Sequence, residues 1–266
     1  MTKSGGENAT RTNATGTLGK AIDVLEAVAA SPTPLRFTDL LGLVDQPRGT
    51  LHRQVSNLIE EELLTVRADH SYELGIKLLK LASLAWSANQ FRAIAEPHLR
   101  HLHEATGETV HLGVLQGVEV IYLDKVEGRQ AVRMHSQIGN ASPVYCTGVG
   151  KAALSALPDA ELEKRIATMI FHRHTESTLA DRAALRAEID EIRRTGIAFD
   201  RQEHEPGIHC VAAPIHSRDR SFVAGVSVTA PSYRIGLARL AEWAPLVTQA
   251  GHAVMEDMAA RLGPKA

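Results

Sequence analysis

The first 75 residues alternate short stretches of helical spacing with turns. After a polar segment of about 16 residues, apolar positions recur at the three- and four-residue intervals of helices that are buried on one face. Pro47 suits the first turn of a helix, and two short β-like runs follow the third helical stretch. The pattern predicts three helices and a hairpin, at residues 18–28, 37–43 and 47–62 and at 64–67 with 71–74.

Helical spacing continues over 76–91 and 93–106, and after Gly107 it changes to the alternating spacing of β-strands. The predicted strands are 110–114, 118–123, 131–136, 197–201, 209–216 and 221–229. The predicted helices among them are 148–157, 159–169, 181–195 and 235–262. Strands that are joined mostly by hairpins and mixed with helices predict an α+β fold for this part of the chain.

The chain is long enough for two domains, since 266 residues exceed the roughly 100–200 residues of one domain. We expect a disordered tail at 1–16, an N-terminal helical domain with a hairpin at 17–75, a linker helix at 76–91 and a C-terminal α+β domain at 92–262.

Charge and cysteine content exclude several classes of protein. Lys and Arg number 29 against 31 Asp and Glu, so the chain is not a histone-like DNA-packing protein coated in positive charge. Two cysteines are too few for a disulfide scaffold and suit a reducing cytosol. The polar N-terminus has no apolar core for a signal peptide, and no apolar run is long enough to cross a bilayer. We therefore expect a cytoplasmic protein with no membrane partner.

The helix predicted at 47–62 follows its neighbour at the spacing of a helix-turn-helix, and the hairpin after it adds a wing. Its apolar stripe leaves a polar face on the N-terminal half, where a recognition helix contacts the major groove. The candidate DNA-binding residues are Arg48, Gly49, Thr50, His52, Arg53, Ser56 and Asn57. The alternative is the solvated face of an ordinary helical bundle, because the acidic run 60–62 leaves this region without net positive charge.

A glycine-rich turn precedes the helix predicted at 148–157. The run Thr147-Gly148-Val149-Gly150-Lys151 is not a phosphate-binding P-loop, because Tyr145 and Ala152 stand where that motif needs Gly and Ser or Thr. Free backbone N–H groups at a helix N-terminus still favour one small anion such as a carboxylate. The alternative is a tight turn with no ligand.

Polar residues on the later strands could complete such an anion site. Ser227 and Thr229 are two positions apart on an apolar strand, so both hydroxyls lie on one face. Asp200 could accept a hydrogen bond from a ligand hydroxyl, and Cys210 begins the preceding strand. Met134 and Ile208 could supply apolar walls.

We expect no catalytic residue, no metal ligand and no cofactor. Cys210 adjoins His209, but neighbours on a strand point to opposite faces, so the histidine cannot easily activate the thiol. Cys146 could join these two residues around a metal, but no tight ligand spacing supports it. The closest pair of histidines, His172 and His174, fits a solvated loop.

Several long motifs, in order over nearly the whole chain, resemble the IclR (isocitrate lyase regulator) family of bacterial transcriptional regulators. TLGKAIDVLEAVA is similar to the family's opening helix, and PRGTLHRQVSNLIEEELL to its recognition helix. YELGIKLLKLA resembles the end of the wing and the linker. ETVHLGVLQGVEVIYLDKVEG, PVYCTGVGKAALS, GIAFDRQEHEPGIHCVAAPI and VAGVSVTAP resemble its effector domain.

The resemblance implies a winged helix-turn-helix joined by a helix to a GAF-like effector-binding domain. It implies a regulator, not an enzyme, that binds double-stranded promoter DNA as a dimer or a dimer of dimers and responds to a small carboxylate. The effector contacts that it implies here are Gly148, Val149, Asp200, Cys210, Ser227 and Thr229, with an apolar wall at Met134, Ser142 and Ile208.

Two positions depart from the family's pattern and bear on the effector. Ser142 replaces a larger apolar residue, and Thr229 replaces the more frequent Ser. A more polar wall suits a hydroxylated ligand, and VRMHSQIGNASPVYCTGVGKA resembles members that control sugar-acid catabolism. We therefore expect a sugar acid or a 2-keto acid. The alternative is a GAF-like metabolite or redox sensor that acts through a protein partner.

Overall fold

The structure is a computed structural model that describes residues 16–130 and 136–262. The tail expected at 1–16 lies outside these residues except for Gly16, as do Met134 and all but the last residue of the strand expected at 131–136. The chain divides into two compact units between Ala88 and Asn89. In the described part of the chain, no helix is both long and apolar enough to cross a membrane.

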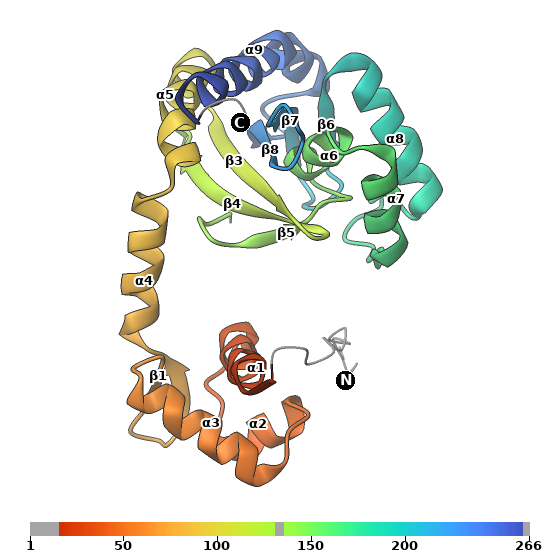
Figure 1. Cartoon of the computed structure of the whole chain (residues 1–266). Helices are drawn as coiled ribbons and strands as arrows, with labels where there is room; N and C mark the ends of the chain where they lie inside the picture. Colours follow the sequence, from red (N-terminus) through yellow and green to blue (C-terminus); the bar gives the residue numbers. More distant parts are fainter. Residues whose placement is uncertain (1–15, 131–135, 263–266) are drawn as a thin grey trace. The chain divides into compact units, whose positions relative to one another are not determined.

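The first unit packs its first three helices against a small hairpin, and a fourth helix follows the hairpin (Figure 1). Its elements are α1 (Gly16–Ala30), α2 (Phe37–Leu43), α3 (Arg48–Glu60), β1 (Leu64–Val66), β2 (Tyr72–Leu74) and α4 (Ile76–Ser87). The two strands are antiparallel, with Leu64 opposite Leu74. The apolar stripes of the helices meet in one core, formed mainly by Val24, Leu40, Leu51, Val55, Leu58 and Leu64.

The recognition-type helix α3 ends two residues before the sequence pattern predicts. Glu62 adopts a left-handed backbone with φ of 58°, and the Leu63 N–H donates to the Leu58 carbonyl at 2.8 Å. This pairing closes the helix as a Schellman motif. Glu62 is exposed, beyond the end of the helix.

The second unit is a six-stranded antiparallel sheet with helices on both faces. Its strands are β3 (Thr109–Gln116), β4 (Glu119–Val126), β5 (Ala141–Pro143), β6 (Ala198–Arg201), β7 (Ile208–His216) and β8 (Val223–Pro231). They lie in the order β5-β4-β3-β8-β7-β6. Its helices are α5 (Gln90–Thr106), α6 (Gly148–Ser155), α7 (Asp159–Thr168), α8 (Arg182–Thr195) and α9 (Leu237–Leu262). Strand β5 had no counterpart in the predicted pattern because it is only three residues long.

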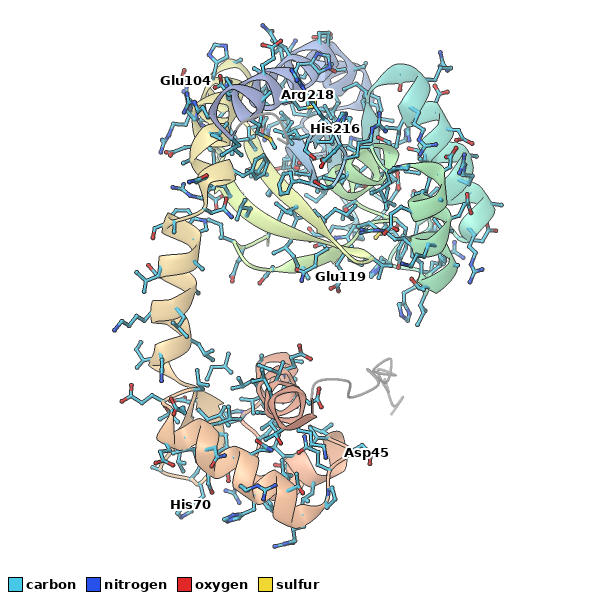
Figure 2. All side chains as sticks on the ribbon, viewed as in Figure 1. Asp45, His70, Glu104, Glu119, His216 and Arg218 are labelled. Carbon is cyan, nitrogen blue, oxygen red and sulfur yellow. The ribbon has the colours of Figure 1, made fainter. Side chains whose placement is uncertain are left out.

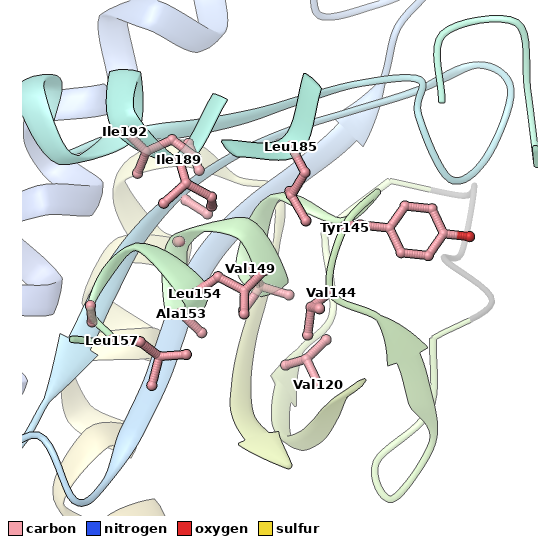
Figure 3. Close-up of a cluster of buried hydrophobic side chains, with 14 of the residues drawn as sticks. Val120, Val144, Tyr145, Val149, Ala153, Leu154, Leu157, Leu185, Ile189 and Ile192 are labelled. Atoms are coloured by element: carbon pink, nitrogen blue, oxygen red, sulfur yellow. The ribbon is translucent and has the colours of Figure 1, made fainter. Parts of the chain in front are cut away.

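Alternation along the strands creates two cores. Val226 and Val228 face α5 and α9, in a core that includes Leu99, Trp243 and Val247. The opposite face packs on α6, α7 and α8 through a second core, whose members include Val120, Val144, Val149, Leu154, Leu185, Ile189 and Ile192 (Figure 3). Every residue of β8 is buried, as expected for a central strand that is covered on both faces.

Charged side chains lie on the outside of both units. Asp45 and His70 are exposed on the first unit, and Glu104 and Glu119 on the second (Figure 2). The α+β fold with an N-terminal helix-turn-helix and wing, predicted from the sequence, is confirmed.

Candidate functional site

The outer face of α3 presents the polar residues that the helical period predicts. Leu51, Gln54, Val55 and Leu58 turn inward and are buried. The candidate residues are exposed except for Thr50, which is half-buried: Arg48, Gly49, His52, Arg53, Ser56 and Asn57. The structure therefore places all seven on one accessible surface, as a helix reading a groove requires.

An aromatic ring of α2 supports two of these side chains. The Arg48 guanidinium lies 5.6 Å from the centre of the Phe37 ring, and the His52 ring meets the same ring edge-on at 5.8 Å. Such contacts restrict the conformations of both side chains before any partner binds. Phe37 was not among the predicted site residues, because an apolar residue on the preceding helix gave no sign of this contact.

The acids that follow α3 are partly neutralised within the same unit. The Glu61 carboxylate accepts a hydrogen bond from the Lys77 ammonium on α4 at 2.8 Å, and this bond lowers the pKa of Glu61. The acidic run lies at the C-terminal end of α3, opposite the end that carries Arg48 and Arg53. The negative charges of residues 60–62 therefore do not lie on the surface at the helix N-terminus.

A pocket opens on the face of the sheet that packs against α6. Its lining comes from every strand of the sheet except β5 and from the loops beside them: His111, Tyr122, Ser136, Thr147, Gly148, Val149, Asp200, His204, Glu205, Ile208, Cys210, Ser227 and Thr229. Its cavity volume is about 40 Å³, which at about 10–15 Å³ for each water is room for a few waters or a small ligand.

Strand register explains why distant residues meet in this pocket. Asp200 on β6 pairs with Cys210 on β7, which pairs in turn with Thr229 on β8. Residues that pair across neighbouring strands share one face of the sheet, so these three form a row. Ser227 lies two residues from Thr229, and its partner on β3 is His111.

The N-terminus of α6 forms one wall of the pocket. A Cβ at Gly148 would come within 2.8 Å of the Cys210 sulfur, and one at Gly150 within 2.5 Å of the Thr147 hydroxyl. Glycine at 148 therefore lets the helix start lie directly against the sheet, and glycine at 150 lets the preceding loop pack closely on the helix. The first backbone N–H groups of α6 have no partner within the helix and carry the positive end of its dipole.

Burial keeps the titratable groups of the pocket uncharged or weakly acidic. Burial raises the pKa of Asp200 to about 7, although the hydrogen bond that Asp200 accepts from the Glu203 N–H at 2.7 Å lowers it. It lowers the pKa of His111 to about 3, so the ring is neutral and bonds to Ser136 at 2.7 Å and Thr229 at 3.2 Å. It raises the pKa of Cys210 to about 12. A thiol with this pKa is a poor nucleophile at neutral pH.

A buried ion network lies behind the turn that carries Asp200. Lys151 is fully buried on α6, and its ammonium lies 2.6 Å from both Glu203 oxygens and 3.0 Å from Glu188. Because the Glu203 N–H also donates to Asp200, this network fixes the turn at the pocket wall. Sequence reasoning had considered Lys151 only as part of a failed phosphate loop.

The predicted effector residues fall into three groups. Seven of them line the pocket: Gly148, Val149, Asp200, Ile208, Cys210, Ser227 and Thr229. Ser142 is buried on β5 and does not line the pocket, but it hydrogen-bonds to Tyr122, which does. Met134 lies outside the described residues.

Six lining residues were missed: His111, Tyr122, Ser136, Thr147, His204 and Glu205. Polar residues at alternate positions of β3 could have indicated His111, which faces the same way as Ser227. The other five lie in loops or on a neighbouring strand. Their positions depend on the order of strands in the sheet, which local spacing does not indicate.

Potential metal ligands also lie beside the pocket. Ligand atoms of Cys146, His174 and His204 all lie within 4.8 Å of one another. Among the described residues, this group does not include His209, whose Nδ1 bonds to the Ile235 carbonyl at 3.1 Å. The possible metal ligands beside Cys146 are therefore His174 and His204, and not the His209 and Cys210 that the sequence suggested.

Comparisons with known proteins match both units. A family model described as bacterial transcriptional regulator IclR C-terminal matches residues 84–256, and one described as IclR helix-turn-helix domain matches residues 17–68. The chain is 31% identical over 236 residues to the HTH-type transcriptional regulator XynR of Escherichia coli, covering 88% of this chain and 94% of XynR.

Two further matches cover most of both chains. The transcriptional repressor IclR of Escherichia coli is 29% identical over 240 residues, which is 89% of this chain and 88% of the repressor. A solved IclR transcriptional regulator from Silicibacter sp. TM1040 superposes with a TM-score of 0.79 at 29% identity, covering 94% of this chain and 98% of that chain. The matched relatives are transcriptional regulators rather than enzymes.

Proposed function

This chain belongs to the IclR family of bacterial transcriptional regulators, and we propose that it is a repressor that binds promoter DNA through α3 and responds to a small carboxylate in the α6 pocket. The observation that carries the proposal is the pocket itself. It gathers, from four separate segments of the chain, every predicted polar contact for an effector.

The carboxylate of the effector docks on the backbone N–H groups of Gly148 and Val149. The hydroxyls of Ser227 and Thr229 donate to its oxygens. Asp200, with a pKa of about 7, is mostly protonated below neutral pH and then donates a hydrogen bond to the keto oxygen of a 2-keto acid. When ionised, it accepts a hydrogen bond from a hydroxyl of a sugar acid. No lysine or arginine lines this pocket in the described residues, so the helix dipole and neutral donors supply the attraction.

The volume of the pocket favours the smaller of the two expected effector classes. A cavity of about 40 Å³ has little free space, so a short 2-keto acid requires a smaller movement of the walls than a six-carbon sugar acid does. We therefore place 2-keto acids of two to four carbons ahead of sugar acids.

DNA binding requires more than one copy of the chain. Arg48 and Arg53 are the two cationic side chains on the exposed face of α3, and phosphate contacts supply most of the non-specific affinity for DNA. In the monomer, α4 has no buried residue although it is rich in apolar side chains. The exposed apolar residues of the first unit lie mostly on α1 and α4: Leu18, Ile22, Ile76, Leu79, Leu81 and Leu84. A second copy that covers this surface doubles the number of recognition helices.

No catalytic step is part of this proposal. The Cys210 thiol is protonated at neutral pH, and His209, the neighbouring histidine, bonds to a backbone carbonyl instead. A nucleophile needs a base within hydrogen-bond reach, which this arrangement does not supply.

The test is a mobility-shift titration of the full chain on DNA from the promoter of its own gene, with pyruvate and gluconate as probes. The proposal expects a specific complex that Arg53→Ala weakens, and a change in DNA affinity with pyruvate that Ser227→Ala abolishes. Failure to bind that DNA at low salt would contradict the proposal and favour a sensor that acts through a protein partner.

A further inference from the structure

Three side chains with metal-binding atoms meet next to the pocket, although they come from three separate segments. Cys146 precedes α6, His174 lies between α7 and α8, and His204 lies in the turn after β6. Their ligand atoms lie within 4.8 Å of one another, and the two imidazole rings are 5.0 Å apart between centres.

Hydrogen bonds between the two loops fix the histidines relative to each other. The Thr178 hydroxyl accepts the N–H of His174 at 3.0 Å and donates to the Glu203 carbonyl at 2.7 Å. The Thr175 hydroxyl donates to the Gln202 carbonyl at 2.6 Å. The segment that carries His174 is thereby joined to the turn that carries His204, without any bound ligand.

Tyr145 orients the exposed histidine of the group. Its hydroxyl donates to the His172 carbonyl and accepts from the His172 N–H, both at 2.9 Å, and lies 3.2 Å from Nε2 of His174. When Nε2 carries the proton of this last bond, Nδ1 keeps the lone pair that a cation needs. A second hydrogen bond of this kind is the usual support of a metal-binding histidine.

The donor set selects the kind of cation. One sulfur and two imidazole nitrogens suit Zn²⁺ and related transition metals, whereas Mg²⁺ and Ca²⁺ require oxygen ligands. Zn–S bonds of about 2.3 Å and Zn–N bonds of about 2.0–2.1 Å place tetrahedral ligand atoms roughly 3.3–3.6 Å apart. The three ligand atoms, which lie within 4.8 Å of one another, must therefore approach by about 1 Å when a cation binds.

We propose that Cys146, His174 and His204 bind Zn²⁺ with the Cys146 thiolate, its proton being released to solvent. Three protein ligands leave a fourth coordination position for water or a carboxylate oxygen. His204 also lines the pocket, so the bound cation lies at the pocket wall. The proposal rests on the positions of these three ligands, so it does not depend on the proposed function in DNA binding.

The test is a Co²⁺ titration of the chelator-treated full chain, because a cysteine-bound Co²⁺ gives a charge-transfer band in the near ultraviolet. We expect one equivalent to bind, and Zn²⁺ to displace it. Cys146→Ser removes the band, and His174→Ala and His204→Ala weaken Co²⁺ binding more than tenfold. Tyr145→Phe, which loses the supporting bond to His174 together with the two bonds to the His172 backbone, weakens it about tenfold.

His172→Ala is the matched control, because His172 is exposed on the same loop and is not in the group. It should bind Co²⁺ as the unaltered chain does. Absence of a stoichiometric Co²⁺ complex, or equal binding by His174→Ala and the unaltered chain, would overturn the proposal. The exposed His174 can be replaced without disturbing the core, so this variant keeps the test decisive if Cys146→Ser does not fold.

Discussion

Replacing Lys151 by Met tests whether the buried ion network holds the second unit together. Lys151 and Glu203 have 0% and 4% of their side chains exposed, and their charged atoms are 2.6 Å apart. Without the ammonium, Glu203 keeps a buried charge with no cation, whereas Glu188 retains Arg201 at 3.2 Å. Removing one partner of a buried pair costs about 3–5 kcal/mol. We expect the free energy of unfolding of the second unit to fall by that amount in urea denaturation at pH 8.

Two comparisons make this prediction specific. The double variant Lys151→Met with Glu203→Leu should recover most of the loss, because it leaves no unpaired charge. Arg194→Ala breaks an ion pair with Glu191 whose side chains are 71% and 54% exposed, so it should cost no more than about 1 kcal/mol. The loss in the single variant should shrink at acid pH, where Glu203 becomes neutral. A loss below about 1 kcal/mol, or no recovery in the double variant, would show that the buried ion pair does not stabilise the second unit in this way.

Three further predictions concern the two sites. Burial raises the pKa of Asp200 from 3.8 to about 7, so the folded state binds the extra proton and stability falls as pH rises between these values. Asp200→Asn should flatten this part of the pH–stability curve; an unchanged slope would contradict the assignment. Because Cys146 and Cys210 are buried with raised pKa values, iodoacetamide should label neither in the native chain at pH 7 and both in urea; rapid native labelling would show an accessible thiolate. Arg53→Ala should weaken promoter binding by about 1–3 kcal/mol, whereas Glu60→Gln on the same helix should not, as fluorescence anisotropy can measure.

Periodicity located most of the fold because the helices and long strands bury one face or both. The helix bounds at 37–43 agree with α2, and the stripe of Leu51, Val55 and Leu58 is the buried side of α3. Strand order could not be read in this way, because β3 pairs with β8 across more than a hundred residues. The end of α3 depended on a left-handed Glu62, a conformation that favours glycine and that spacing alone does not indicate.

The pocket was partly predictable for a similar reason. Ser227 and Thr229 share a face by strand alternation, and Gly148 lies at a helix start, so both features are local. Residues that reach the pocket through strand register or loop placement could not be predicted from local spacing. His204 and the Lys151–Glu203 pair are the clearest cases. Contacts of this kind depend on the tertiary fold.

We propose that a carboxylate in the α6 pocket controls DNA binding by α3. The most direct measurement is the affinity of the full chain for its promoter DNA with and without pyruvate, compared with Thr229→Val, which removes one pocket hydroxyl. We expect a change of about 5–150-fold for the unaltered chain and little change for the variant, with equal affinity for DNA when pyruvate is absent. An identical response to pyruvate in both proteins would contradict it.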